Sequence, residues 1–192
     1  MLLRRQEPWP RFLPSQEHRD ERNRYPAMKH LLLLAVLALP ACAKSAPPLP
    51  DGPPLDPLAF FTGRSHGDAT LAQIMKSDRS VTVESRGRMG KDGWLTLDQH
   101  ILAQGDKPRD RSWKLRQAGP GHWTGTLTDA VGPVEAVTNG GGVLIRYTMK
   151  GGLTVEQTLM PIAGRRALDN HLYVTKLGLQ LAHLHEIISK RQ

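Results

Sequence analysis

From Phe60 onward, short runs of alternating apolar and polar residues are separated by turns that contain glycine. In one such run, Leu95, Leu97, Gln99 and Ile101 fall on one face, and Gly105 follows the run. Alternation with a period of two is typical of β-strands, whereas a helix repeats every 3.6 residues over ten or more positions. With turn signals every ~8–12 residues, the pattern predicts an antiparallel barrel or sandwich.

The pattern predicts about nine strands. They are Leu71–Lys76, Ser80–Arg88, Trp94–Gln104, Arg111–Gln117, His122–Thr128, Val143–Met149, Leu153–Met160, Asp169–Leu177 and a last run from Gly178 to Lys190. The last run is ambiguous, because Leu177, Leu181, Leu184 and Ile188 also fit a helical stripe. Its alternation fits a strand as well, and we predict a strand.

The only cysteine of the chain, Cys42, ends a segment with the composition of a secretory signal. Met28 opens a basic start, nine apolar residues follow over 31–39, and Pro40 and Ala41 precede Cys42. This run is too short to cross a bilayer, which takes ~20 residues. The last four residues resemble a bacterial lipobox. We therefore expect residues 28–41 to be a lipoprotein signal peptide and Cys42 to be acylated, for example with palmitate; the alternative is an ordinary thiol near a cleaved signal.

The segments on either side of this signal show no pattern of a folded core. Residues 1–27 hold six arginines, four acidic residues and four prolines. We interpret them as an upstream extension, with Met28 as the true start, or else as an unusually long n-region. Six prolines lie between residues 43 and 59, and they favour extended polyproline II. We expect 42–59 to be a disordered lipidated tether, and 60–190 to be the barrel domain.

The formal net charge of +8 gives little support to nucleic-acid binding. Seven of the 26 Lys and Arg residues precede Cys42, and no dense basic run with interleaved aromatic residues remains after it. Attraction to anionic lipid headgroups is still allowed. We expect no nucleic-acid partner.

Three tryptophans open or centre predicted strands. They are Trp94, Trp113 and Trp123. The plain interpretation is that they fill the core. In a barrel of about eight strands, however, the interior just holds side chains or one small ligand, so tryptophans that do not fill it line a pocket. We expect Trp113 and Trp123 to contribute to such a pocket.

Five short motifs lie along the predicted barrel: Phe61-Thr62-Gly63, Arg111–Leu115, Gly125–Gly132, Arg146-Tyr147-Thr148 and Lys176-Leu177-Gly178. Together they resemble a family of small bacterial lipoproteins that is catalogued as a domain of unknown function, number 3833. The resemblance covers roughly residues 60–190. It implies an all-β, antiparallel up-and-down barrel similar to a lipocalin, with eight to nine strands, and it implies no activity.

Asp129 is the carboxylate of most interest. It lies where a predicted strand ends, and an Asp at such a turn commonly accepts backbone N–H bonds. The alternative is a pair with Arg146 across neighbouring strands, which in a barrel mouth would orient a ligand headgroup. We include Asp129, Arg146 and Tyr147 among the candidate ligand-binding residues.

Other residues with chemical potential have plain interpretations. His183 and His185 share one face of a strand and would suit zinc, but zinc needs a third ligand and Glu186 points to the opposite face. Ser65, His66 and Asp68 lack the strained turn of a nucleophile. The glycines of 140–142 suit a hairpin turn better than a phosphate loop. We expect no catalytic residue, metal or cofactor, and hence no enzyme.

The sequence leaves two hypotheses for function. The first is a lipid-anchored barrel of the bacterial cell envelope, at the outer membrane and facing the periplasm, that binds a small apolar or amphipathic molecule. The second is a structural or interaction subunit with a filled barrel, which docks on an envelope protein. The outer membrane is expected because Ala43, rather than Asp, follows Cys42.

Overall fold

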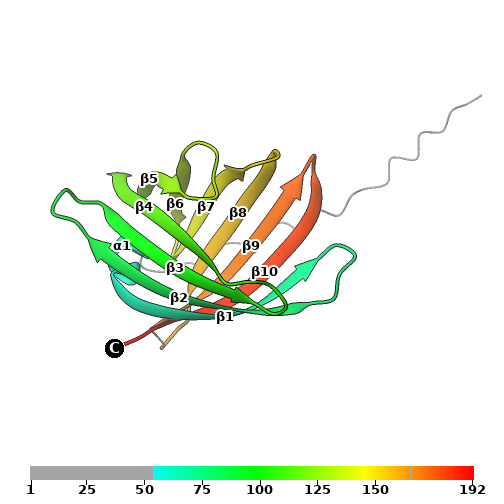
Figure 1. The fold of residues 1–192 in the computed structure, drawn as a ribbon. Helices are drawn as coiled ribbons and strands as arrows, with labels where there is room; N and C mark the ends of the chain where they lie inside the picture. Colours follow the sequence, from blue (N-terminus) through cyan, green and yellow to red (C-terminus); the bar gives the residue numbers. More distant parts are fainter. Residues whose placement is uncertain (1–53, 165) are drawn as a thin grey trace, which may run out of the picture. The chain divides into compact units, whose positions relative to one another are not determined.

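The computed structural model describes residues 54–164 and 166–192, with the side chain of Asn139 excepted. The signal segment, Cys42 and most of the predicted tether lie outside the described residues. Ten strands and one short helix make up the fold (Figure 1). They are α1 (Pro57–Phe61), β1 (Gly63–Gln73), β2 (Arg79–Met89), β3 (Leu95–Ala103), β4 (Arg109–Gly119), β5 (His122–Leu127), β6 (Val134–Asn139), β7 (Gly142–Met149), β8 (Leu153–Pro161), β9 (Ala167–Lys176) and β10 (Leu179–Lys190).

The strands form a closed antiparallel barrel in which each strand pairs with its neighbour in sequence and β1 pairs with β10. The register of the closing pair runs from Ser65 opposite Lys190 to Gln73 opposite Ala182. The prediction of an all-β up-and-down barrel is confirmed, with ten strands instead of eight to nine, and the ambiguous last run is a strand. No helix in the described part of the chain has the length and apolar character to span a bilayer.

Two strand segments were not predicted from the sequence, because their inward residues are small or few. β1 begins at Gly63 instead of Leu71, and its first inward positions are Ser65, Gly67 and Ala69. These residues give no apolar alternation. β6 has six residues and only two buried apolar side chains, Val134 and Ala136.

α1 closes one end of the barrel. Asp56 caps the helix, because its carboxylate accepts the backbone N–H groups of Leu58 and Ala59. Leu58 and Phe61 are buried in the main core cluster. Residues 57–59, predicted as part of the extended tether, therefore belong to this helix.

Gly87 on β2 allows α1 to approach the barrel wall. A Cβ atom at this position would lie 1.9 Å from the carbonyl oxygen of Phe61. Only a residue without a side chain fits this contact.

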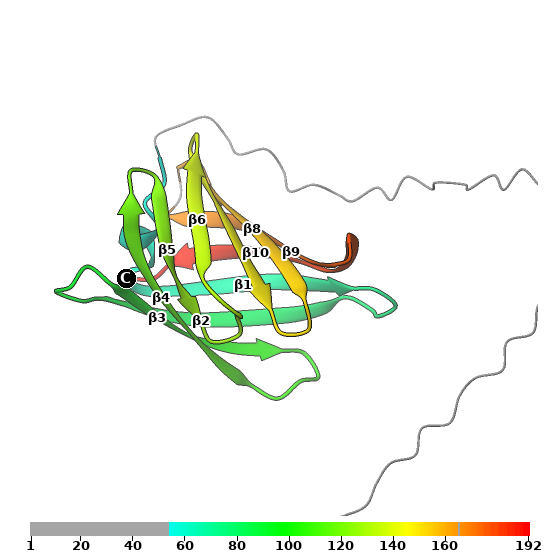
Figure 2. The same cartoon turned by 90° about the horizontal axis from the view of Figure 1, so that it is seen from above.

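The other end of the barrel, which we call the mouth, is formed by five connections: 74–78, 104–108, 128–133, 150–152 and 177–178. In an up-and-down barrel every second connection returns at the same end, so these five share one end and α1 and the end of β10 share the other. Figure 2 shows α1 and the C-terminus on one side and the tip of the β1–β2 hairpin on the opposite side. The mouth and α1 therefore lie at opposite ends of the barrel.

Candidate functional site: the barrel cavity

A cavity of about 530 Å³ runs through the barrel from α1 to the mouth. Small-molecule sites commonly have ~300–1,000 Å³. Phe61 of α1 lines its closed end, whereas Arg79, Asp106 and Arg109 line it at the mouth. The side chains of Asp106 and Arg109 are more than half exposed, so the cavity communicates with solvent there.

Most of the cavity wall is apolar. The inward residues of the strands supply it: Leu71, Val81, Val83, Leu97, Ile101, Leu115, Ile145, Leu159, Leu172, Val174, Leu184 and Ile188. This wall offers burial to an apolar group, at about 25 cal/mol per Å² of apolar surface.

Arg111 places a guanidinium group in this wall. Its Nε and Nη2 donate to Oε1 of Gln99 at 3.1 and 3.0 Å. Nε1 of Trp113 donates to the same oxygen at 2.7 Å, and the guanidinium carbon lies 5.4 Å from the Trp113 ring centroid. Among the described residues, no carboxylate lies within ion-pair distance of Arg111, although buried cations are normally paired.

The burial of Arg111 is electrostatically costly. Desolvation lowers the pKa of its guanidinium, and the nearby Tyr147 phenol acts in the opposite direction. The residue is partly exposed, and it lines the cavity. An anion in the cavity would meet a cation that no described carboxylate contacts directly, although Asp129 and Glu186 act on it at longer range.

Tyr147 lies beside this group. Its ring packs edge-on against Trp113, with the ring centroids 5.7 Å apart and the ring planes at 86°. Burial raises the pKa of its phenol, so the hydroxyl stays protonated and remains a hydrogen-bond donor.

Glu186 supplies a buried carboxyl group on another part of the wall. Nδ2 of Asn170 donates to its Oε2 at 2.7 Å. Desolvation raises the pKa of Glu186, while the bond from Asn170 lowers it to a smaller extent. Gly67 leaves the space that this carboxyl group occupies, because a Cβ there would lie 1.8 Å from Oε1.

Two residues that line the cavity, Gln157 and Asn170, each have an amide oxygen that no described residue satisfies. Oε1 of Gln157 and Oδ1 of Asn170 are buried and have no hydrogen-bond partner in the part of the chain that the structure describes. Buried acceptors normally have partners, so these oxygens are polar groups that the described residues leave unsatisfied.

The structure brings together three of the residues predicted to bind a ligand. Trp113, Tyr147 and Asp129 all line the cavity. Trp123 is buried in the core cluster but is absent from the lining. Arg146 lies on the outer face, because the inward residues of β7 are its odd-numbered neighbours.

The pair considered between Asp129 and Arg146 is not formed, and this interpretation is wrong. Asp129 lies at the mouth, where its carboxylate is 3.4 Å from Nη1 of Arg109. Arg146 instead pairs with Glu156 on β8 at 2.9 Å, an exposed pair of small energetic value. The connection after β5 directs Asp129 toward β4 and away from the outer face of β7.

Trp94 lies outside the barrel interior. It is partly exposed, and the Arg116 guanidinium carbon lies 4.8 Å from its ring centroid.

Sequence reasoning missed Arg111, Gln99, Glu186 and Gln157 as cavity residues. For Arg111 the signal was present: it precedes Trp113 by two positions, so both side chains share one face of β4. Gln99 was expected on the inward face of its strand, and Gln157 and Glu186 have the same spacing of two from apolar residues. None of the three was predicted to line a site, because a polar residue at an inward position looks like a break in the apolar pattern.

The Ser65, His66 and Asp68 set does not form a catalytic triad. Ser65 faces inward, and its hydroxyl has no hydrogen-bond partner among the described residues. His66 faces outward, where Nδ1 is 2.7 Å from Glu84 and Nε2 is 3.1 Å from Asp68. Neighbouring residues of a strand point to opposite faces, so the hydroxyl and the imidazole do not meet.

A second hollow, of about 680 Å³, lies over the outer faces of β2, β3 and β4 and is lined mainly by exposed charged residues. Two of its carboxylates are already paired. Asp98 lies 2.5 Å from Arg88, and Asp110 lies 2.8 Å from His100. It has no enclosed apolar wall, and the barrel cavity is therefore the better candidate site.

Two solved structures show the same kind of fold. The S-type phycobiliprotein lyase CPES from Guillardia theta matches with a TM-score of 0.54 and 7% identity, over 70% of this chain and 90% of its own. Rv2717c from M. tuberculosis matches with a TM-score of 0.53 and 15% identity, over 72% of this chain and 99% of its own. At these identities the similarity shows a shared lipocalin-like barrel fold.

No curated protein matches the chain in sequence. A family model does match, over residues 36–190, which confirms the resemblance seen in the sequence motifs. The lipoprotein character of the chain stays a prediction. The matched range includes nearly all of the described barrel, and the chain belongs to the DUF3833 family, described as proteins of unknown function.

Proposed function

We propose that the barrel binds a small amphipathic molecule with an acidic headgroup. The main support for this proposal is Arg111, a desolvated cation in the cavity wall without a carboxylate partner among the described residues. A carboxylate or phosphate is the natural partner of a guanidinium, and Tyr147 supplies a neutral donor beside it. The apolar wall accommodates the tail of the ligand.

The size of the cavity favours this function over the second hypothesis. A filled barrel would be close-packed, with few voids larger than a water molecule. The cavity of about 530 Å³ supports a barrel that holds a ligand.

We further propose that acylated Cys42 anchors the chain at the outer membrane with the barrel in the periplasm. The support is the lipobox-like end of the signal segment and Ala43 after it. The absence of enzymatic activity also stays a prediction.

The test compares an acid with an alcohol of the same chain length. Calorimetric titration of the full chain with dodecanoate and with dodecanol measures how much the headgroup contributes. Charge-assisted hydrogen bonds contribute ~1.5–3 kcal/mol, so Arg111→Met is expected to weaken dodecanoate binding by ~10–150-fold. Dodecanol binding should weaken by the smaller factor of ~3–12-fold, since neutral hydrogen bonds contribute about half as much.

Lys114→Met is the matched control, because it removes a cation from the exposed outer face of the same strand. Equal losses in Arg111→Met and Lys114→Met would refute the role of Arg111. If neither dodecanoate nor dodecanol shows saturable binding to the wild type at concentrations up to ~100 μM, the proposed function fails.

A further inference from the structure

We infer that the outer face of β9 and β10 carries a binding site for a transition-metal ion of the zinc class, formed by Asp169, His171 and His185. The site is independent of the barrel cavity. It lies on the opposite face of the same two strands, whose inward residues include Asn170 and Glu186.

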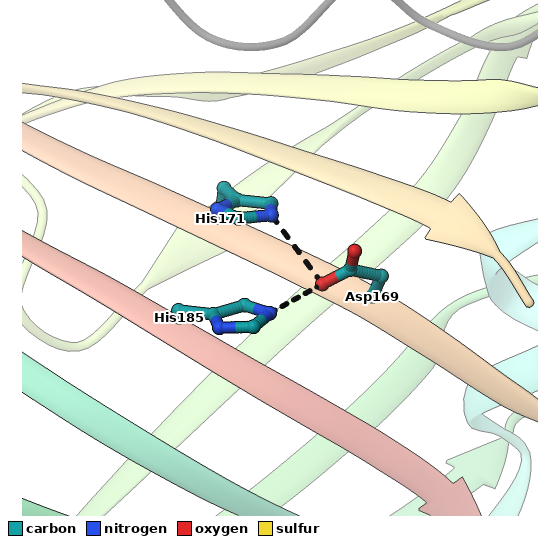
Figure 3. Close-up of side chains that lie close together, drawn as sticks. All are labelled: Asp169, His171 and His185. Carbon is teal, nitrogen blue, oxygen red and sulfur yellow. Dashed lines mark hydrogen bonds and ion pairs between the residues drawn. The ribbon is translucent and has the colours of Figure 1, made fainter. Parts of the chain in front are cut away.

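The pairing of β9 with β10 brings the three side chains together. His171 lies directly opposite His185, and Asp169 lies two residues before His171 on the same face. Nε2 of His185 is 2.8 Å from Oδ1 of Asp169, and Nε2 of His171 is 3.4 Å from the same oxygen. Figure 3 shows both imidazoles directed at this carboxylate.

The spacing of the donor atoms suits one ion. One ligand atom from each residue lies within 4.8 Å of the other two. Four-coordinate zinc holds ligands at ~2.0–2.2 Å, and two imidazoles with one carboxylate form a common donor set. The imidazole rings of His171 and His185 are stacked, with their centroids 4.5 Å apart and their planes at 8°. Both Nε2 atoms lie near the same oxygen of Asp169.

His183 orients the site from outside it. Its Nε2 lies 3.2 Å from Nδ1 of His171, and the two rings are stacked. When Nδ1 of His171 donates this hydrogen bond, Nε2 carries the lone pair that a metal requires. Metal-ligating histidines commonly have such a partner on the other ring nitrogen.

Thr158 on β8 is a second, independent feature of the same surface. It lies directly opposite His171 in the sheet register and therefore on the outer face. Thr158 is 1% exposed, and its hydroxyl has no hydrogen-bond partner among the described residues. Opposite His171, this surface therefore holds one buried polar group that no described residue satisfies.

Other histidine–carboxylate pairs of the barrel differ in composition. His66 has two carboxylates, His100 has Asp110, and His122 has Glu135, each with one imidazole. In the described part of the chain, the Asp169 group alone has donor atoms of three residues this close together. Two imidazoles favour zinc over the hard cations that prefer oxygen donors.

The experiment is a Zn²⁺ titration of the untagged full chain against a chromophoric chelator at neutral pH. We expect one equivalent bound with a Kd below ~10 μM, and at least a tenfold loss in both His185→Ala and Asp169→Asn. Co²⁺ should give the visible absorption of a four-coordinate ion in the wild type and lose it in the variants.

His100→Ala is the matched control, since it removes an exposed imidazole that pairs with a single carboxylate. It should leave the affinity and the Co²⁺ spectrum unchanged. Unchanged binding in His185→Ala, with the fold verified by circular dichroism, would overturn the assignment, as would no binding tighter than ~100 μM in the wild type.

A second inference concerns the mouth, and a different observation carries it. We propose that two hairpin tips at the mouth contact an anionic lipid bilayer. Met75 and Leu177 are 96% and 98% exposed, although both are large and apolar. Both also have left-handed backbone, with φ of 59° and 50°, a conformation that residues other than glycine rarely adopt.

The two tips form one surface. Ile74 donates its backbone N–H to the carbonyl of Leu181 at 2.9 Å, which joins the β1–β2 hairpin to β10. Ile74 and Leu179 are also more than half exposed.

The charge around this surface complements an anionic membrane. Three adjacent connections of the mouth, 74–78, 150–152 and 177–178, hold or adjoin three exposed lysines: Lys76, Lys150 and Lys176. The same three connections contain one acidic residue, Asp78. Apolar tips with flanking lysines are typical of protein surfaces that lie at the headgroup boundary.

A dye at defined positions tests the contact in the full chain. A solvatochromic dye is attached at Met75→Cys or at Met89→Cys, each in a Cys42→Ser background. Met89 is an equally suitable apolar site, because it is 43% exposed at the opposite end of the barrel. With phosphatidylglycerol vesicles, the emission at position 75 should shift to the blue and the emission at 89 should not.

Replacing Lys76, Lys150 and Lys176 together with Gln should weaken the vesicle affinity reported at position 75 by ~100-fold, since each lysine contributes roughly fivefold. An unshifted dye at 75, an equal shift at 89, or an equal response to pure phosphatidylcholine would each overturn the proposal.

Discussion

Gly87→Ala tests the way in which α1 closes the barrel. The added Cβ would lie 1.9 Å from the carbonyl oxygen of Phe61. Carbon–oxygen contacts are comfortable at ~3.3–3.6 Å, so helix and strand must separate by about 1.4 Å or more. The backbone of Phe61 cannot rotate away as a flexible side chain would, and α1 must therefore move outward.

The cost follows from the side chains that α1 buries. Leu58 and Phe61 are 8% and 7% exposed. Full burial of such a side chain is worth ~1.5–3 kcal/mol, which sets an upper limit of about 6 kcal/mol for complete detachment of α1. A partial displacement forfeits a quarter to a half of the dispersion contacts, so we expect a loss of ~1–3 kcal/mol in the free energy of unfolding.

Urea unfolding followed by circular dichroism measures this loss. Gly119→Ala is the matched control: this glycine also lies in a strand, its φ is not positive, and a Cβ there would meet no atom within 4 Å. It should change stability by less than ~0.5 kcal/mol, or raise it slightly by restricting the unfolded chain. A Gly87→Ala variant as stable as Gly119→Ala would refute the argument that α1 lies tightly against β2.

Three further predictions follow from the site and the sequence. Burial raises the pKa of Glu186, so the folded state holds its proton more tightly than the unfolded state, and stability should fall as pH rises from the ordinary glutamate pKa. Glu186→Gln should remove this fall, by about 1.4 kcal/mol for each unit of raised pKa, in urea midpoints measured between about pH 4 and 8. Trp113→Ala removes a ring that is 4% exposed and should cost ~3–5 kcal/mol in thermal unfolding; a cost under ~1 kcal/mol would contradict its place in the core. Cys42→Ser should release the protein from membranes into the soluble fraction, and equal retention after a high-salt wash would contradict a lipid anchor.

Most of the strands could be predicted from the alternation of apolar and polar residues, because an inward apolar residue at every second position produces a period of two in the sequence. It failed where the inward positions are small, as in the first half of β1, and where a helix of five residues, α1, follows a proline-rich stretch. So short a helix has no repeat to detect.

The site was predictable only within single strands. The shared face of Trp113 with Arg111 can be read from a spacing of two, whereas the partners of Asp129 and Arg146 depend on how the mouth connections bend. Two of the three proposed metal ligands were equally hidden. Asp169 and His171 lie on another strand from His185, and their proximity to it depends on the β9–β10 register.

The pairing of β1 with β10 has a consequence for folding. It joins residues as distant as Ser65 and Lys190, whereas all other pairs join neighbours in sequence. Next to this β1–β10 pairing, Arg191 donates its backbone N–H to the carbonyl oxygen of Arg64 at 3.0 Å. The Lys190 ammonium contacts the carbonyls of Phe60 and Thr62.

The loop-closure entropy of the barrel is therefore concentrated in one late step. A circular permutant that links the C-terminus to the start of α1 and opens at Gly151 turns the β1–β10 pairing into a local hairpin. The same ring of strands then closes last between β7 and β8. Which pair limits the folding rate is thus set by where the chain is cut, while the set of native contacts is unchanged.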